Sequence, residues 1–171
     1  FVLCLCVRFL HYVCWDRVLG VSCLFCQAED GIRDLVRSRG HGDVYKRQQD
    51  STVNDNDGQG GAGTGPATPT QTTSGKLKNA QTFDGSADFV NVPNHSSLNP
   101  TSQITVEAWI KTSTADRWVL DKLDGSQLNG YRFYGTGSGN IVLEVIAGSS
   151  VRTANSSPTT ITNNAWRHVV G

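Results

Sequence analysis

The feature that most constrains the fold is a strict alternation of side chains in the segment from Ile104 to Ile110. The even-numbered positions are all apolar: Ile104, Val106, Ala108 and Ile110. The intervening positions fall on the other side of an extended chain: Thr105, Glu107 and Trp109. A period of two residues is typical of a β-strand that buries one face. The segment therefore predicts a half-buried antiparallel strand.

A second apolar run, Phe89–Val92, precedes this strand across a connection rich in Pro, Asn and Ser. Pro93 and Pro100 exclude a continuous helix through the connection, because proline has no N–H to donate and clashes with the preceding turn. Before the first run, Asp84-Gly85-Ser86 supplies turn chemistry, since glycine tolerates positive φ and aspartate accepts from nearby backbone N–H groups. These features predict an all-β protein, with this stretch forming part of an antiparallel sandwich.

The same stretch carries a family resemblance. FDGSADFVNVP at 83–93 and ITVEAWIK at 104–111 resemble the opening of LamG-like jelly-roll domains in the concanavalin A-like lectin/glucanase superfamily. NGYRF at 129–133 and WRHVVG at 166–171 resemble later strands of that family in the same order, and DST at 50–52 with NDNDG at 54–58 and TSGKL at 73–77 resembles its beginning. The resemblance covers about residues 50–171, and Phe89 stands where the family more often has tyrosine. It implies a concanavalin A-like jelly roll, C-terminally truncated here, from an extracellular or cell-surface protein.

The first 26 residues differ sharply from the rest of the chain. They contain all five cysteines: Cys4, Cys6, Cys14, Cys23 and Cys26. A signal peptide, a membrane span, or a metal or redox site built on Cys23 and Cys26 are the possible functional interpretations. Arg8, Asp16 and Arg17 interrupt any apolar span, and one CxxC without a second pair is a weak zinc signal. We expect residues 1–26 to be chimeric or out-of-frame sequence.

Residues 27–48 resemble translated sequencing-library adapter. QAEDGIRD at 27–34 and SRGHGDVYKRQ at 38–48 match translations of two adapters used in short-read sequencing libraries, with His41 as a one-base departure. A variable library index accounts for residues 35–37. We therefore expect residues 27–48 to be translated adapter, and its arginines and lysine are not interpreted as a basic arm for nucleic acid.

These observations divide the remaining chain into two parts. Residues 49–75 are a polar loop or linker rich in Gly, Thr and Asn, and residues 76–171 are the partial LamG-like domain. Asp55-Asn56-Asp57-Gly58 resembles the start of a calcium loop, but the later ligands of an EF-hand are missing, so an exposed turn is expected. Beyond residue 48 there is no basic cluster and no apolar span, so we expect neither a nucleic-acid partner nor a membrane span there.

Hydrolysis of a glycosidic bond requires two carboxylates that flank it. Beyond residue 48 the only glutamates are Glu107 and Glu144, which lie on different expected strands and have no acidic residue two positions on. The histidines there, His95 and His168, have no cysteine to activate. We therefore predict no catalytic residue, and no enzyme activity, in this domain.

Recognition of a ligand is the remaining chemistry. Trp118, beside Asp116 and Arg117, is the aromatic residue most expected to face solvent, whereas Trp109 and Trp166 are expected in the core. The predicted ligand-binding residues are Trp118, Asp124, Asn129 and Tyr131. A structural Ca²⁺ at Asp84 and Asp88 stays open, although two carboxylates fall short of the six to eight oxygens that calcium takes. No other cofactor is expected.

The sequence therefore favours a non-catalytic carbohydrate- or protein-binding, or adhesion, module of a larger secreted or surface protein. Its expected partners are a glycan or an extracellular protein, together with other domains of the parent chain. One alternative is an accessory domain of an extracellular polysaccharide-active glycoside hydrolase, and another is a structural spacer in a repetitive surface protein.

Overall fold

The computed structural model describes residues 2–10, 21–24, 47–48, 50, 52–61, 67–76, 78–156 and 161–171. The described elements are thirteen strands and one short 3-10 helix. The strands that precede the helix are β1 (Val2–Leu10), β2 (Val21–Leu24), β3 (Arg47–Gln48), β4 (Gly58–Gly60), β5 (Thr70–Gly75), β6 (Lys78–Thr82) and β7 (Val90–Asn91). The helix is η1 (Ser96–Leu98), and it is followed by β8 (Thr105–Lys111), β9 (Trp118–Leu123), β10 (Asn129–Gly135), β11 (Ile141–Ala147), β12 (Ser150–Asn155) and β13 (Arg167–Val170).

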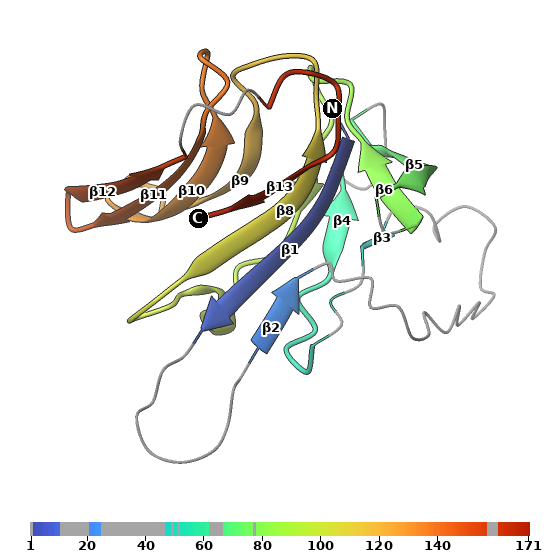
Figure 1. The fold of residues 1–171 in the computed structure, drawn as a ribbon. Coiled ribbons are helices and arrows are strands. Elements are labelled where there is room, and N and C mark those ends of the chain that lie inside the picture. The colour runs from blue at the N-terminus through green and yellow to red at the C-terminus, as the bar shows by residue number, and fades with distance from the viewer. Residues whose placement is uncertain are drawn as a thin grey trace.

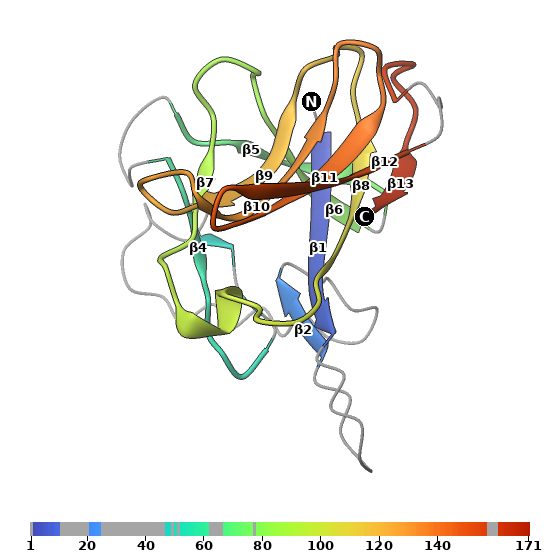
Figure 2. The same cartoon turned by 90° about the vertical axis from the view of Figure 1, so that its left-hand side faces the viewer.

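The strands form two main sheets and one small one. The larger sheet has the order β13-β8-β1-β6-β5, with β2 also paired to β1. The second sheet is a four-stranded meander, β12-β11-β10-β9, and the small sheet is β3-β4-β7. All strand pairs are antiparallel. Figures 1 and 2 show the two main sheets as separate layers, with β8 and β13 in one and β9 to β12 in the other. The predicted all-β antiparallel sandwich is confirmed.

The alternation that opened the sequence argument is present in β8. Val106, Ala108 and Ile110 are buried, with exposed fractions of 0%, 1% and 0%, and the residues between them are only half-buried. The buried side chains contact a core formed from both main sheets. Its buried members are Leu98, Val106, Ala108, Ile110, Tyr131, Phe133, Ile141, Leu143, Ile161 and Val169. The period-two pattern therefore identified the inner face of this sheet correctly.

The expectation that Trp109 and Trp166 fill the core is wrong. Both are half-buried and neither belongs to the core cluster. Trp109 lies on the outer face of β8, where its ring centroid is 5.0 Å from that of His168 and Lys76 Nζ lies 5.1 Å from the ring centroid. The outer face of the strand gives a tryptophan enough neighbours to cover most of its ring, so burial of the residue does not require the core.

Strand β1 lies in the larger sheet between β8 and β6. Its residues pair with β8 from Val2 opposite Lys111 to Arg8 opposite Thr105. Only Val2 and Leu3 pair with β6. Half of the expected chimeric segment and most of the expected adapter, at 1, 11–20 and 25–46, lie outside the described residues. The division of the chain at Gln48 stays a prediction.

The polar segment expected to be a loop or linker, residues 49–75, contains strands β4 and β5. Its order comes from pairing with other parts of the chain, because β4 pairs with β7 and β5 pairs with β6. Composition alone did not indicate these partners. Within the described part of the chain, no helix is long and apolar enough to cross a membrane.

Candidate functional site

An exposed aromatic pair lies at the start of β9. The Trp118 side chain is 55% exposed, and its ring centroid lies 4.9 Å from that of Tyr134, with the two planes tilted by 42°. Tyr134 is opposite Trp118 in the β9–β10 pairing. Because β10 buries Tyr131 and Phe133, the alternation places Tyr134 on the outer face of the four-stranded sheet. The prediction that Trp118 faces solvent is confirmed.

A row of charged side chains runs beside this aromatic pair. Arg132 lies opposite Asp121 on β9 and opposite Glu144 on β11. Its guanidinium carbon is 5.7 Å from the Trp118 ring centroid, and its Nε is 3.5 Å from Glu144 Oε1. That Nε atom is shielded from solvent and forms no hydrogen bond with the described residues. The aromatic pair and this row together form the outer surface of the sheet, which we call the aromatic surface: Trp118, Tyr134, Arg132, Asp121 and Glu144.

Asp124 and Asn129 lie at the other end of β9 from Trp118, and they bind each other. Asn129 Nδ2 donates to Asp124 Oδ2 at 2.8 Å, and the Asp124 carboxylate also accepts from Leu128 N and Ser126 Oγ. These bonds, with that from Asn129 first among them, lower the pKa of Asp124 from 3.8 to about 2. Six strand residues span about 20 Å, so the two residues are not part of the aromatic surface. Their hydrogen bonds hold the β9–β10 turn.

Tyr131, the fourth predicted ligand-binding residue, is buried and does not lie on the surface beside Trp118. Its side chain is only 5% exposed, and its hydroxyl donates to the Leu98 carbonyl oxygen at 3.1 Å. Burial raises the pKa of this phenol above its ordinary value of 10.0. Tyr131 is therefore a core residue that connects β10 to η1, and it does not face the same side of the sheet as Trp118.

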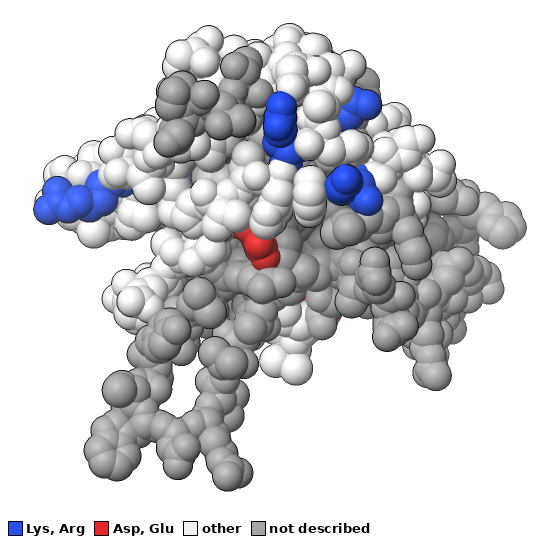
Figure 3. Space-filling model, in the orientation of Figure 1, with Lys and Arg blue, Asp and Glu red and all other residues white. Residues whose placement is uncertain are grey.

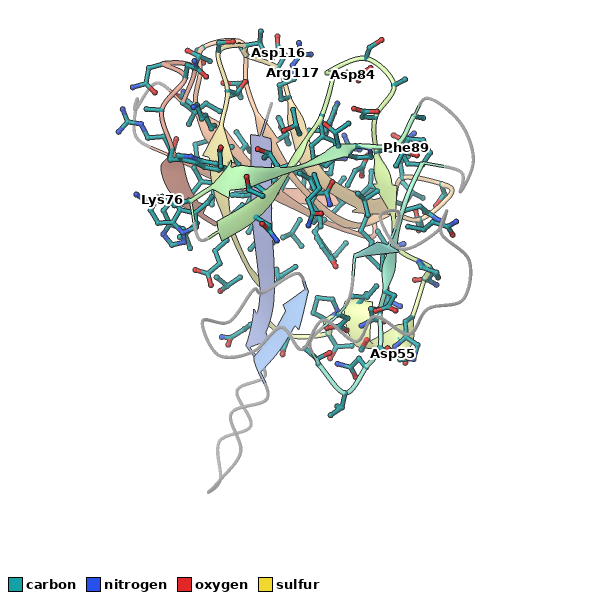
Figure 4. All side chains as sticks on the ribbon, turned by 90° about the vertical axis from the view of Figure 1, so that its right-hand side faces the viewer. Asp55, Lys76, Asp84, Phe89, Asp116 and Arg117 are labelled. Carbon is teal, nitrogen blue, oxygen red and sulfur yellow. The ribbon has the colours of Figure 1, made fainter. Side chains whose placement is uncertain are left out.

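The predicted calcium residues form a closed local turn. Asp84 Oδ1 accepts hydrogen bonds from the backbone N–H groups of Ser86, Ala87 and Asp88, and Asp88 Oδ2 accepts from Asp84 N. The bonds from Ser86, Asp88 and Ala87 lower the pKa of Asp84. The Arg117 guanidinium lies against Gly85, and Figure 4 shows Asp84, Asp116 and Arg117 at one end of the domain. Within the described residues no group of three or more His, Cys, Asp or Glu could hold a metal ion.

The two glutamates considered for catalysis lie on different sheets. Glu107 is on the outer face of β8, where its Oε2 is 3.2 Å from His168 Nε2. Glu144 is on the outer face of β11, because its neighbours Ile141 and Leu143 line the core. Packed sheets are about 10 Å apart, so two outer faces are separated by both sheets and the core. Such a separation exceeds that of the paired carboxylates in glycoside hydrolases.

Among the described residues on the face that Figure 1 presents, few side chains are charged. In the space-filling view of this face, Lys and Arg side chains lie apart from one another and do not gather into one continuous patch (Figure 3). His95 is exposed, as expected, and caps η1, where its Nδ1 accepts from Ser97 N.

Sequence reasoning named Trp118 but missed the residues that support its ring. Tyr134 and Arg132 occupy alternate positions of β10, opposite in direction to Tyr131 and Phe133. The period of two in this strand was the signal that could have found them. It would also have placed Tyr131 inside.

Comparison with known proteins agrees with the architecture. The family model described as the concanavalin A-like lectin/glucanases superfamily matches residues 84–171, just over half of the chain. Searches of the curated proteins and of the solved structures found no match. The matched segment runs from the Asp84 turn through β13 and contains the whole aromatic surface. The chain therefore belongs to the concanavalin A-like lectin/glucanase superfamily, with a LamG-like domain.

Proposed function

We propose that this domain is a non-catalytic carbohydrate-binding module of a larger secreted or surface protein. The observation that carries the proposal is the exposed Trp118 ring, which Tyr134 supports from the neighbouring strand. An aromatic face stacks on the C–H face of a sugar ring, and adjacent polar groups bind its hydroxyls.

The charged row supplies those polar groups. Asp121 is exposed and lies opposite Arg132, whose guanidinium carbon is 5.7 Å from the Trp118 ring centroid. The contact between Arg132 and Glu144 restrains the guanidinium, so less side-chain entropy is lost when a ligand binds. The chain belongs to a superfamily that contains lectins and is commonly extracellular, and this membership supports the same function. The same exposed surface could instead bind an extracellular protein or serve in adhesion.

Two other roles remain as alternatives for the parent protein. This domain can accompany the catalytic domain of an extracellular polysaccharide-active glycoside hydrolase, or it can be a spacer in a repetitive surface protein. The separation of Glu107 and Glu144 on opposite outer faces supports binding without turnover in this domain.

The test compares Trp118→Ala with Phe89→Ala in the full chain on a glycan array, followed by calorimetric titration of any glycan that binds. Phe89 is the matched control, because it is also an exposed aromatic side chain, at 46%, and lies outside the aromatic surface. Loss of an aromatic anchor costs about 1–3 kcal/mol of binding free energy, which is roughly a 5- to 150-fold rise in Kd. We expect this loss for Trp118→Ala and none for Phe89→Ala.

Equal affinity in wild type and Trp118→Ala would remove the aromatic surface from the site. A reducing-sugar assay on each bound glycan tests turnover, and we expect no release. Release that Glu107→Gln or Glu144→Gln abolishes would overturn the non-catalytic proposal.

A further inference from the structure

A polar cavity lies away from the aromatic surface. It has a volume of about 190 Å³ and is formed by Asn54–Asp57 on one wall and Pro93–His95 on the other. Asp55 lies at the opposite end of the domain from Asp84 and Asp116 in Figure 4. The cavity therefore does not share residues with the surface around Trp118.

The first wall is held by a buried carboxylate. Asp50 is only 4% exposed, and it accepts hydrogen bonds from Thr52 N at 2.8 Å and from Asn56 N at 2.9 Å. Asp57 Oδ1 in turn accepts from Asp50 N at 2.9 Å. These hydrogen bonds tie Asp50 to Thr52, Asn56 and Asp57.

The two walls are joined to each other. Asn56 Nδ2 donates to Ser97 Oγ at 3.0 Å, and the same hydroxyl lies 2.8 Å from His95 Nδ1. On the second wall, Lys122 Nζ donates to Asn94 Oδ1 at 3.0 Å. The cavity is thus formed before a ligand arrives, which reduces the entropy lost on binding.

The charge of the walls selects among ligands. Asp55 and Asp57 are carboxylates, and no lysine or arginine is among the residues that form the walls. Lys122 lies at the margin, where it donates to Asn94. The Asp55 side chain is exposed and takes no hydrogen bond from the described residues. An anion such as phosphate or sulfate would be repelled. A site for Zn²⁺, which takes Cys, His and carboxylate ligands, is disfavoured because the described residues offer no group of three or more His, Cys, Asp or Glu.

A neutral polyhydroxylated ligand fits these groups best. Each sugar hydroxyl can donate to a carboxylate and accept from an amide N–H, and the walls carry both kinds of group. The volume is below the roughly 300–1,000 Å³ of pockets for drug-sized ligands, and it equals that of about six water molecules. We propose that this cavity binds one neutral sugar unit, such as the end of a glycan chain, independently of the aromatic surface.

The experiment titrates the ¹⁵N-labelled full chain with the methyl glycosides of glucose, galactose, mannose and N-acetylglucosamine. We expect at least one of them to shift the amide signals of Asn54–Asp57 and His95 saturably. Asp55→Asn keeps a residue type that tolerates the φ of 55° at this position while it removes the charged acceptor. It should weaken binding about tenfold, because a hydrogen bond to a charged group is lost.

Asp116→Asn is the matched control, since Asp116 is also an exposed aspartate with a φ of 51° and lies at the other end of the domain. It should leave the cavity signals and their affinity unchanged, and so should Trp118→Ala. A cavity that responds to CaCl₂ and to none of the four glycosides would overturn the proposal in favour of a cation site. No response to either, or equal affinity in wild type and Asp55→Asn, would also overturn it. The glycan-array result for Trp118→Ala tests only the aromatic surface, and the result for Asp55→Asn tests only the cavity. Failure of one proposal is therefore distinguishable from failure of the other.

Discussion

Substitution of Tyr131 by Phe removes only the phenol hydroxyl. It therefore tests whether this hydroxyl stabilises the core or binds a ligand. The Tyr131 hydroxyl donates to the Leu98 carbonyl at 3.1 Å, and both residues are buried, at 5% and 4% exposed. Phenylalanine keeps the ring in the core and removes only the donor. A neutral hydrogen bond contributes about 0.5–1.5 kcal/mol, and a buried group that loses its partner costs about 1–3 kcal/mol. We therefore expect the free energy of unfolding to fall by about 1–2 kcal/mol.

Urea unfolding of the full chain, followed by tryptophan fluorescence, measures this change. With a slope of about 1–3 kcal/mol per molar urea, the midpoint should fall by roughly 0.3–2 M while the slope stays constant. Tyr134→Phe is the control, because it removes the phenol hydroxyl from the outer face of the same strand. A surface change of this kind stays within about 0.5 kcal/mol.

The pH dependence gives a second, independent readout. Burial raises the pKa of Tyr131 in the folded state, so the unfolded chain releases this proton first as the pH rises. Its contribution to stability is fully present below pH 10 and is lost progressively above it. Wild type should therefore lose stability above pH 10 more steeply than Tyr131→Phe. An unchanged urea midpoint in Tyr131→Phe, combined with weaker glycan binding, would refute the assignment of Tyr131 to the core.

Three further predictions follow from the β9–β10 hairpin and from the sequence. Hydrogen bonds lower the pKa of Asp124 to about 2, so its contribution to stability is lost as the pH falls from about 4 toward 2; melting temperatures at pH 5 and 2.5 should differ less in Asp124→Asn than in wild type. Gly130 has a φ of +135°, and an added Cβ would overlap the Lys122 carbonyl oxygen; Gly130→Ala should lower stability by more than about 1 kcal/mol, which a small urea shift would contradict. Amplification of the source DNA should yield no codons for residues 27–48 upstream of Asp50, and their recovery in frame would disprove the adapter interpretation.

The fold was predictable because the sequence of one strand, β8, alternates regularly between apolar and more polar side chains. The alternation around Val106, Ala108 and Ile110 fixed the strand, its buried face and the fold class. Trp109 shows the limit of that signal: its position in the alternation placed it on the outer face, yet the general preference of tryptophan for burial suggested the core. Neighbouring side chains on an outer face can cover a large ring, and no single strand reveals those neighbours.

The candidate site was only partly predictable, because hydrogen-bond partners are set by folding. Trp118 was identified from its polar neighbours in sequence. Asp124 and Asn129 have the side chains of a ligand site, but they satisfy each other within a turn, and their sequence gave no sign of it. The cavity is still harder to predict from the sequence, because its walls at 54–57 and 93–95 are distant in the chain. Pairing of β4 with β7 brings them together.

The position of β8 between β1 and β13 has a consequence for the order of folding. Both neighbours are distant from β8 in the sequence, and Val2 pairs with Lys111 across a separation on the order of 100 residues. The meander from β9 to β12 needs only contacts between adjacent hairpins, so it can form while the chain is still being synthesised at about 5–20 residues per second. β1 precedes β8 in the chain, but the β8 edge that pairs with β13 stays open until β13 has emerged. Until then its backbone N–H and C=O groups are open to strands of other nascent chains, and the ribosome-bound stage is when this domain is most exposed to misassembly.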